Sequence, residues 1–441
     1  MLTRSDVAAH ASDVGRAFWH WLRLAAPAER LTPLGLLRLM LWRALRIGLV
    51  LVTLEIAGLI FIISYRRWKP QPKHIIFPHE SRPPVMVGEH ELTIYDYGED
   101  AFRAMFADIK AARESVLVET YQFNNDEVGN TFRKRLIRQA QRGVKVFLIF
   151  DSIGSWSLPA RLRRFPRNVH TFEFGPIRSL RTLFKQGVLV RDHRKILVVD
   201  KRVAYLGGIN IGKEYRRRWR DTHLRIAGPL AQNVAYAFDA FWDAYHPGGA
   251  SPLVFTTATD PRITIIANDP LRREFPIRDC YLAAFQEAQH SIRIASSYFL
   301  PPRTLIDALT AAAGRGVKVE LLLPDDSDVP LVDWAARNLF AEFLAHGVTI
   351  WIYQRTVNHS KTCTIDGRWS TIGSANLDSF SLHGNFEINA FIRDEAFAAQ
   401  MEAMWHNDLK NCVRLDPVDW ANRSPVSRFA ELFARPLIPY L

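Results

Sequence analysis

Short apolar runs alternate with amphipathic stretches over most of the chain, and this pattern predicts alternating strands and helices. Two sets stand out, each made of a strand, a helix and a second strand: Val116–Glu119, Asn130–Arg142 and Val144–Phe150, then Ile292–Ala295, Arg303–Arg315 and Val317–Leu323. In both sets an Arg-Gly-Val segment separates the helix from its second strand, as expected where glycine ends a helix. The sequence therefore predicts βαβ units and an α/β fold with a largely parallel or mixed sheet.

The two sets belong to a longer internal repeat. Three landmarks recur in the same order, at offsets of 176, 173 and 166 residues: Glu114–Phe123 with His290–Phe299, Arg142–Val146 with Arg315–Val319, and His193–Asn210 with His359–Asn376. Duplication of one α/β unit explains so regular an order. We therefore expect two similar domains, residues 76–260 and 261–441, packed as a pseudo-dimer with the functional site at their junction.

A different pattern fills residues 1–75, which we expect to form a membrane anchor and linker. Ile47–Tyr65 carries a single charge, Glu55, and a helix of this length spans about 28 Å, close to the thickness of bilayer hydrocarbon. Upstream, Leu34–Arg46 mixes apolar residues with arginines, which is typical of an interfacial helix. A buried core helix or an uncleaved signal sequence is the alternative, and similar numbers of basic residues on the two flanks leave the orientation open.

Two further segments could face a membrane. Arg178–Gly187 mixes basic residues with leucine and phenylalanine, and the end of the chain combines a predicted helix, Ser427–Ala434, with apolar residues after it. An ordinary solvated connection and a helix packed on the core are the respective alternatives.

Composition and charge restrict the class of protein. The chain has 441 residues, of which 48% are apolar and 23% charged, a balance typical of globular proteins. The 57 basic residues exceed the 45 acidic residues by 12, which favours an anionic partner such as nucleic acid, an acidic membrane or a phosphorylated substrate. Three widely spaced cysteines indicate neither a disulfide framework nor a CxxC metal site.

The repeat contains a motif of histidine, lysine and aspartate with constant spacing: His193, Lys195 and Asp200 in the first half, and His359, Lys361 and Asp366 in the second. Alternation along a strand puts the histidine and the lysine on one face, where both can reach one anionic group. An imidazole beside a cation provides the nucleophile and the charge neutralisation that phosphoryl transfer needs. The aspartates could instead hold the turn after the strand, and we assign them no proton transfer.

Small and polar residues follow each motif, in GGIN and in GSAN. Backbone amides can approach a phosphate closely where side chains are small, and serine and asparagine side chains can donate to its oxygens. We therefore predict four phosphate-binding residues: Gly208, Asn210, Ser374 and Asn376.

Two other interpretations of the motif were weighed. A single His-x-Lys pair on a strand is most often a surface feature, but two copies at matching places in a repeat favour a catalytic role. Paired histidines could also bind zinc; however, HExxH is absent and the neighbouring lysines would repel a metal ion. We therefore expect neither a metal nor another cofactor.

With two HxKxxxxD motifs, the chain resembles the phospholipase D superfamily, and within it the bacterial cardiolipin synthases of the phospholipase D type. The resemblance runs from about Glu91 to the C-terminus and includes RDHRKILVVD, RDTHLRIAGP, GSANLDSFSLHGNFEIN and RFAELFARPLIPYL. It implies two phospholipase D-like α/β domains that form a pseudo-dimer. The chain departs from many members at Lys201, where glycine is common, and at Phe380, where many synthases have arginine.

The resemblance also implies roles for individual residues. One motif histidine attacks phosphorus and the other transfers the proton, with His193 favoured as the nucleophile, although the symmetric sequence does not distinguish the two. An acidic residue beyond each motif orients a histidine, which here corresponds to Asp221 in WRDTH and Glu387 in NFEIN. Lys195 and the second motif lysine hold the phosphate oxygens.

The leading hypothesis is a membrane-bound phosphatidyltransferase that makes cardiolipin from two molecules of phosphatidylglycerol through a phosphohistidine. A hydrolase that releases phosphatidic acid would use the same residues. A nuclease fits the charge, but we expect no nucleic-acid partner because no recognised binding module is present; a non-catalytic scaffold would not retain both motifs. The expected location is the bacterial inner (cytoplasmic) membrane, and the free thiol of Cys363 favours the cytoplasmic side. The sequence does not determine the oligomeric state.

Overall fold

The computed structural model describes residues 77–175, 190–248, 257–325 and 327–434. Residues 62–441 belong to one compact unit, so the two halves of the repeat are described together. The predicted anchor at 47–65, the predicted interfacial helix at 34–46 and the basic segment at 178–187 lie outside the described residues. Within the described ranges, no helix combines the length and the apolar character needed to cross a bilayer.

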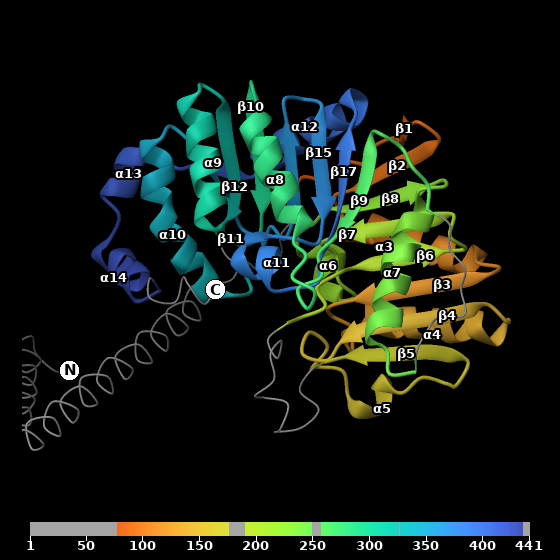
Figure 1. Ribbon diagram of the computed structural model, residues 1–441. Coiled ribbons are helices and arrows are strands. Elements are labelled where there is room, and N and C mark those ends of the chain that lie inside the picture. Colours follow the sequence, from red (N-terminus) through yellow and green to blue (C-terminus); the bar gives the residue numbers. More distant parts are fainter. Residues whose placement is uncertain (1–76, 176–189, 249–256, 326, 435–441) are drawn as a thin grey trace, which may run out of the picture. The chain divides into compact units, whose positions relative to one another are not determined.

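The first half builds an eight-stranded sheet with the order β1-β2-β8-β7-β6-β3-β4-β5 (Figure 1). Strands β3, β4 and β5 are parallel and the remaining neighbours are antiparallel. The elements are β1 (Val85–Val87), β2 (His90–Tyr95), α3 (Gly98–Ala111), β3 (Ser115–Thr120), α4 (Glu127–Gln141), β4 (Lys145–Asp151), α5 (Ala160–Arg163), β5 (Val169–Phe174), β6 (Ile196–Val199), β7 (Val203–Gly207), α6 (Lys213–Arg217), β8 (His223–Ala227) and α7 (Ala231–Tyr245).

The second half repeats this arrangement, with the strand order β18-β13-β12-β10-β14-β15-β17-β9 and parallel pairing of β10, β12 and β13. Its elements are β9 (Ile263–Ala267), α8 (Pro276–Glu287), β10 (Ser291–Ser296), β11 (Phe299–Leu300), α9 (Arg303–Gly314), β12 (Lys318–Pro324), α10 (Pro330–Ala345), β13 (Thr349–Tyr353), β14 (Lys361–Ile365), β15 (Trp369–Gly373), β16 (Leu377–Asp378), α11 (Ser379–His383), β17 (Ile388–Arg393), α12 (Glu395–Leu409), β18 (Cys412–Arg414), α13 (Pro417–Ala421) and α14 (Pro425–Ala434). The prediction of two similar halves with mixed sheets is confirmed.

Local sequence explains why these elements begin and end where they do. Asp126 accepts hydrogen bonds from two backbone amides of the first turn of α4 and caps that helix. After α4 and α9, Gly143 and Gly316 take φ values of +88° and +90°, a backbone conformation that favours glycine and turns the chain into the next strand. Strand β4, which follows α4, is apolar on both faces: Leu148 packs in one buried cluster and Phe147 in another.

The two halves share a hydrophobic core. One buried cluster contains Leu206 and Leu224 from β7 and β8 together with Ile372 and Ile388 from β15 and β17. Burial of apolar surface from both sheets in one cluster holds the halves together, and Figure 1 shows β7 and β8 beside β15 and β17. The motifs of the two halves therefore meet at an interface inside one rigidly packed body.

Candidate active site

The motif histidines are positioned by a short backbone pairing between the halves that occurs twice. Before β6, the His193 amide donates to the Phe386 carbonyl (N···O 3.0 Å) and the Phe386 amide donates to the Arg191 carbonyl (2.9 Å). In the related arrangement before β14, the His359 amide donates to the Arg220 carbonyl (2.7 Å). Each histidine is thereby fixed against the segment of the other half that carries its acidic residue.

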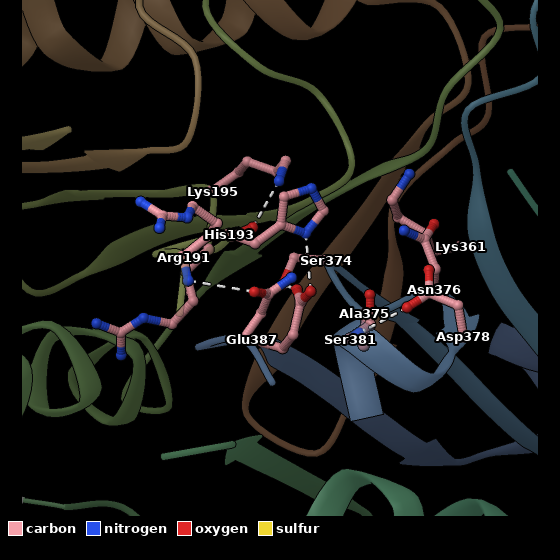
Figure 2. Close-up of polar contacts among 12 residues, drawn as sticks. Arg191, His193, Lys195, Lys361, Ser374, Ala375, Asn376, Asp378, Ser381 and Glu387 are labelled. Atoms are coloured by element: carbon pink, nitrogen blue, oxygen red, sulfur yellow. Dashed lines mark hydrogen bonds and ion pairs between the residues drawn. The ribbon is translucent and has the colours of Figure 1, made fainter. Parts of the chain in front are cut away.

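The acidic residues implied by the resemblance are crossed between the halves. His193 Nδ1 lies 2.8 Å from Glu387 Oε1 (Figure 2), and His359 Nδ1 lies 2.7 Å from Asp221 Oδ2. The four residues thus form two histidine–carboxylate pairs, and each pair joins one half to the other. A carboxylate on Nδ1 fixes the imidazole so that Nε2 faces the reacting group, and it stabilises the imidazolium form.

The two motif lysines lie beside the imidazoles. Lys195 Nζ donates to the His193 carbonyl and Lys361 Nζ to the His359 carbonyl, both at 2.5 Å, and Lys361 Nζ also lies 3.3 Å from His359 Nε2. Figure 2 shows the side chains of both lysines beside the His193 ring. The ammonium groups can therefore contact an anion bound at the histidines, as the motif predicts.

Burial shifts the pKa values of these groups towards their neutral forms. Removal from water lowers the pKa of Lys195 to about 7, although Glu387 attracts its charge and opposes the shift. Burial also lowers the pKa of His193 well below its usual range, helped by the two lysines, and that of His359 below its usual value. A bound anion would reverse these shifts by stabilising the cations.

The surroundings shift the pKa values of the two acids in opposite directions. Burial raises the pKa of Glu387 well above its usual range, and the attraction of Lys195 does not offset it. Burial also acts to raise the pKa of Asp221, but the charge of His359 and its hydrogen bond outweigh burial and leave the pKa lowered. Asp221 is therefore the acid that its surroundings hold more strongly in the ionised form.

Two of the predicted phosphate ligands have hydrogen-bond partners within the protein, and phosphate binding by them stays a prediction. The Gly208 amide donates to the Thr222 carbonyl at 2.9 Å, and the Ser374 hydroxyl donates to Glu387, so these donors already have partners in the protein. A Cβ atom at Gly208 would lie 2.0 Å from Asp221 Oδ1. Glycine is required there because it makes room for the carboxylate that orients His359.

The two asparagines support the site through the neighbouring chain. Asn210 accepts the Gln122 amide (3.1 Å) and donates to the Tyr215 hydroxyl (2.8 Å). Asn376 accepts the Ser297 hydroxyl at 3.0 Å. These contacts tie the segments after the motifs to the ends of β3 and β10, so direct phosphate binding by the asparagines stays a prediction.

The motif aspartates lie at turns and bind backbone amides. Asp200 accepts hydrogen bonds from the amides of residues 113–115, and Asp366 accepts from those of residues 289–291. Both take positive φ values, 51° and 53°, in the turn after the motif strand. They hold the strand that follows α3 or α8 against the motif strand, which supports the structural interpretation of these aspartates; a catalytic role for them stays an untested prediction.

Sequence reasoning missed several aromatic residues around the imidazoles. Tyr121 packs edge-on against His193 with ring centroids 5.0 Å apart, and Tyr215 and Tyr298 do the same against His359 at 5.3 and 6.4 Å. Tyr121 and Tyr298 lie where β3 and β10 end, inside the first landmark of the repeat, so the repeat carried a signal for them. Across the described residues, no group of three or more metal-ligating side chains is present.

Comparison with known proteins agrees with this geometry. The model of the family described as "Cardiolipin synthase, PLD-like domain" matches residues 105–242 and 281–409, once in each half. The chain is 32% identical to a probable cardiolipin synthase, YwiE, of Bacillus subtilis, over 77% of this chain and 70% of that protein. It is also 32% identical to a cardiolipin synthase of Geobacillus kaustophilus, over 82% of this chain and 77% of that protein.

A solved structure is similar in fold. The phosphatidylserine synthase of Haemophilus influenzae superposes with a TM-score of 0.61 at 14% identity, covering 82% of this chain and 95% of that one. At this identity, the match supports the arrangement of two α/β halves and nothing finer.

Proposed function

The chain belongs to the family of phospholipase D-like cardiolipin synthases, and from this membership we propose that it is a membrane-bound phosphatidyltransferase that makes cardiolipin from two molecules of phosphatidylglycerol. The observation that carries the proposal is the crossed pair of histidine–carboxylate contacts between the halves, each beside a buried lysine. Two imidazoles held in this way can act on opposite sides of one phosphodiester.

The first step transfers the phosphatidyl group to the protein. His193 Nε2 attacks phosphorus, the bond from phosphorus to the glycerol oxygen breaks, and His359 gives its proton to that oxygen. In the second step, a hydroxyl of another phosphatidylglycerol gives its proton to His359 and attacks phosphorus, and the bond to His193 breaks. One glycerol is released for each cardiolipin, and both imidazoles return to their initial states.

The different environments of the histidines support this division of roles. A nucleophile must be unprotonated, and burial with two neighbouring lysines lowers the pKa of His193 strongly. A general acid must carry a proton, and the ionised Asp221 opposes the lowering of the pKa at His359. The imidazolium form is therefore more accessible at His359, the residue assigned to proton transfer.

The lysines are assigned to the phosphate oxygens. Two cations beside a phosphodiester neutralise the charge that develops in the transition state, and their low exposure keeps water from screening that interaction. We also assign Asn210 and Asn376 to the phosphate site. They act there as positioning residues, and direct contact of their side-chain amides with phosphate belongs to the same proposal.

The location is proposed from the sequence. Residues 1–75 would anchor the chain in the bacterial cytoplasmic membrane, and the halves at 76–260 and 261–441 would act at its cytoplasmic side. The net positive charge suits an anionic lipid surface, because each juxtamembrane Lys or Arg gains about 1 kcal/mol there.

The test uses the full-length chain in vesicles that contain phosphatidylglycerol labelled separately in its headgroup and in its acyl chains. We expect all of the acyl label in cardiolipin and the headgroup label divided equally between free glycerol and the central glycerol of cardiolipin. Phosphatidic acid as the only lipid product would overturn the transferase in favour of the hydrolase. The His193→Ala variant is the control, since it should give neither product.

A further inference from the structure

One acidic residue at the site has no role in the chemistry described above. Asp328 lies between β12 and α10. Its carboxylate accepts a hydrogen bond from the Tyr298 hydroxyl at 2.5 Å, and the Tyr298 ring packs against His359. Asp328 itself is exposed, so the carboxylate is fixed at one edge yet open to solvent.

The charge of Asp328 acts on groups from both halves. Burial is the main reason why the pKa values of Tyr121 and Tyr215 are raised, and the charge of Asp328 adds to this shift. Burial lowers the pKa values of His359 and Lys361, and the same charge opposes that shift. Through Tyr298, which donates to it and packs against His359, this carboxylate lies on the His359 side of the site. The phenols stay protonated at neutral pH and can donate hydrogen bonds beside it.

The corresponding place in the first half has no charge. Strands β4 and β12 are related by an offset of 173 residues. At this offset in the sequence, Asp328 corresponds to Ser155. Ser155 is buried, and its hydroxyl accepts the Phe123 amide (2.9 Å) and donates to the Tyr121 carbonyl (3.2 Å). Of these two positions, Asp328 therefore carries a charged hydrogen-bond acceptor, whereas Ser155 does not.

We propose that Asp328 is a specificity-determining residue that accepts hydrogen bonds from the free hydroxyls of a glycerol headgroup. This inference rests on the proposed function and names the headgroup that the site selects. In phosphoryl transfer the attacking and leaving oxygens are roughly in line through phosphorus. With His193 on one side, the leaving glycerol lies on the side of His359, and this is the side on which Asp328 lies.

The chemistry of the residue favours a hydroxyl. A carboxylate repels phosphate, for which the two buried lysines are already placed, but it accepts strong hydrogen bonds from an alcohol. The carboxylate has about four acceptor sites and Tyr298 occupies one of them, so a vicinal diol can be bound as well. The second phosphatidylglycerol enters by the same route, because its attack reverses the departure of the first headgroup.

The test is a competition between donor lipids that differ only in headgroup hydroxyls. Vesicles contain equal amounts of phosphatidylglycerol and phosphatidylpropanol, with matched acyl chains, and mass spectrometry follows how fast each is consumed as a donor, from the glycerol and the propanol released. We expect the wild-type chain to prefer phosphatidylglycerol and Asp328→Asn to lose about tenfold of that preference; a change of rate that both lipids share, through His359 and Lys361, leaves this ratio unaltered. Tyr298→Phe, which releases the carboxylate without removing it, should lose a smaller part.

Asp325→Asn is the matched control, because Asp325 lies three residues away and pairs with Arg337 (3.6 Å). Equal loss on both lipids in Asp328→Asn, or an unchanged ratio, would overturn the inference. Phosphatidylethanolamine, as a third donor, tests whether Asp328 binds an ammonium group instead of a hydroxyl. A change confined to that lipid would also overturn the inference. Consumption ratios report on Asp328 whether cardiolipin or phosphatidic acid forms, so failure of the transferase is read separately from the products.

Discussion

The buried ion pair between Arg220 and Asp408 offers a quantitative test of how the halves are held together. Arg220 directly precedes Asp221 in the first half, and Asp408 lies on α12 in the second. The guanidinium donates to both carboxylate oxygens of Asp408, at 2.9 and 2.5 Å, and to the Thr222 hydroxyl, and Arg220 is fully buried. The perturbation is Asp408→Ala, which removes the carboxylate and leaves the guanidinium without its counterion.

The loss of stability expected in Asp408→Ala comes mainly from leaving the Arg220 guanidinium buried without its counterion, and less from losing the attraction between the two charges. Burial raises the pKa of Asp408 although Arg220 opposes the shift, whereas the attraction of Asp408 outweighs burial at Arg220 and raises its pKa. Desolvation thus offsets much of the attraction, as is usual for buried pairs, whose replacement by apolar side chains is often neutral. A stranded buried charge, by contrast, costs about 3–5 kcal/mol in the free energy of unfolding. Turnover should fall as well, because the Arg220 carbonyl accepts the His359 amide.

The assay is urea denaturation of the full-length chain in detergent, followed by circular dichroism, with free energies taken from the midpoints. Asp307→Ala is the control: Arg303 and Asp307 form an exposed pair at 2.8 Å, and its loss should cost below about 1 kcal/mol. The double variant Arg220→Met/Asp408→Leu should recover most of the loss, since no charge stays buried. A loss within about 1 kcal/mol in Asp408→Ala would refute the reasoning.

Three further predictions concern the motifs. Because burial lowers the pKa of Lys195 to about 7, the ammonium loses its proton as the pH rises through that value, so kcat/KM on vesicles should fall above about pH 7; a profile that stays flat to about pH 9 would contradict this. His359→Ala should lower turnover of phosphatidylglycerol by roughly 10²–10⁴-fold but spare the first-turnover release of p-nitrophenol from phosphatidyl-p-nitrophenol, whose leaving group needs no proton, whereas His193→Ala should abolish both; loss of that first-turnover release in His359→Ala would remove its role as the acid. Asp200→Ala should lower the free energy of unfolding by about 2 kcal/mol, because it frees three backbone amides, while kcat of the folded protein stays near the wild-type value; a large drop in kcat would return this residue to the catalytic group.

The repeat and most of the secondary structure could be read from the sequence because they depend on local spacing. The apolar run at Val116–Glu119 forms part of β3. The helix expected at Asn130–Arg142 is α4, which begins three residues earlier, directly after its Asp126 cap. The same spacing marked the two motif histidines, since duplication preserves the order of residues along the chain. None of this required knowing how the halves pack.

The small residues after the motifs show where local spacing misled. GGIN and GSAN are typical of a backbone that approaches phosphate, yet Gly208 is required by the nearness of Asp221, thirteen residues away in sequence. A pattern can show that a position must be small, but it does not show which neighbour takes up the space. That neighbour is fixed only when β8 pairs with β7.

The sequence by itself determined that one α/β unit occurs twice and that each copy carries an imidazole, an ammonium group and a nearby acid. Only the tertiary structure decided that each acid serves the imidazole of the other copy, across 194 residues for His193 and Glu387 and 138 for Asp221 and His359, and that Asp328 breaks the symmetry on one side. The physical reason is that periodicity records which side chains share a face of one element. Contacts between distant elements depend on how two buried surfaces fit together, and no local pattern encodes that fit.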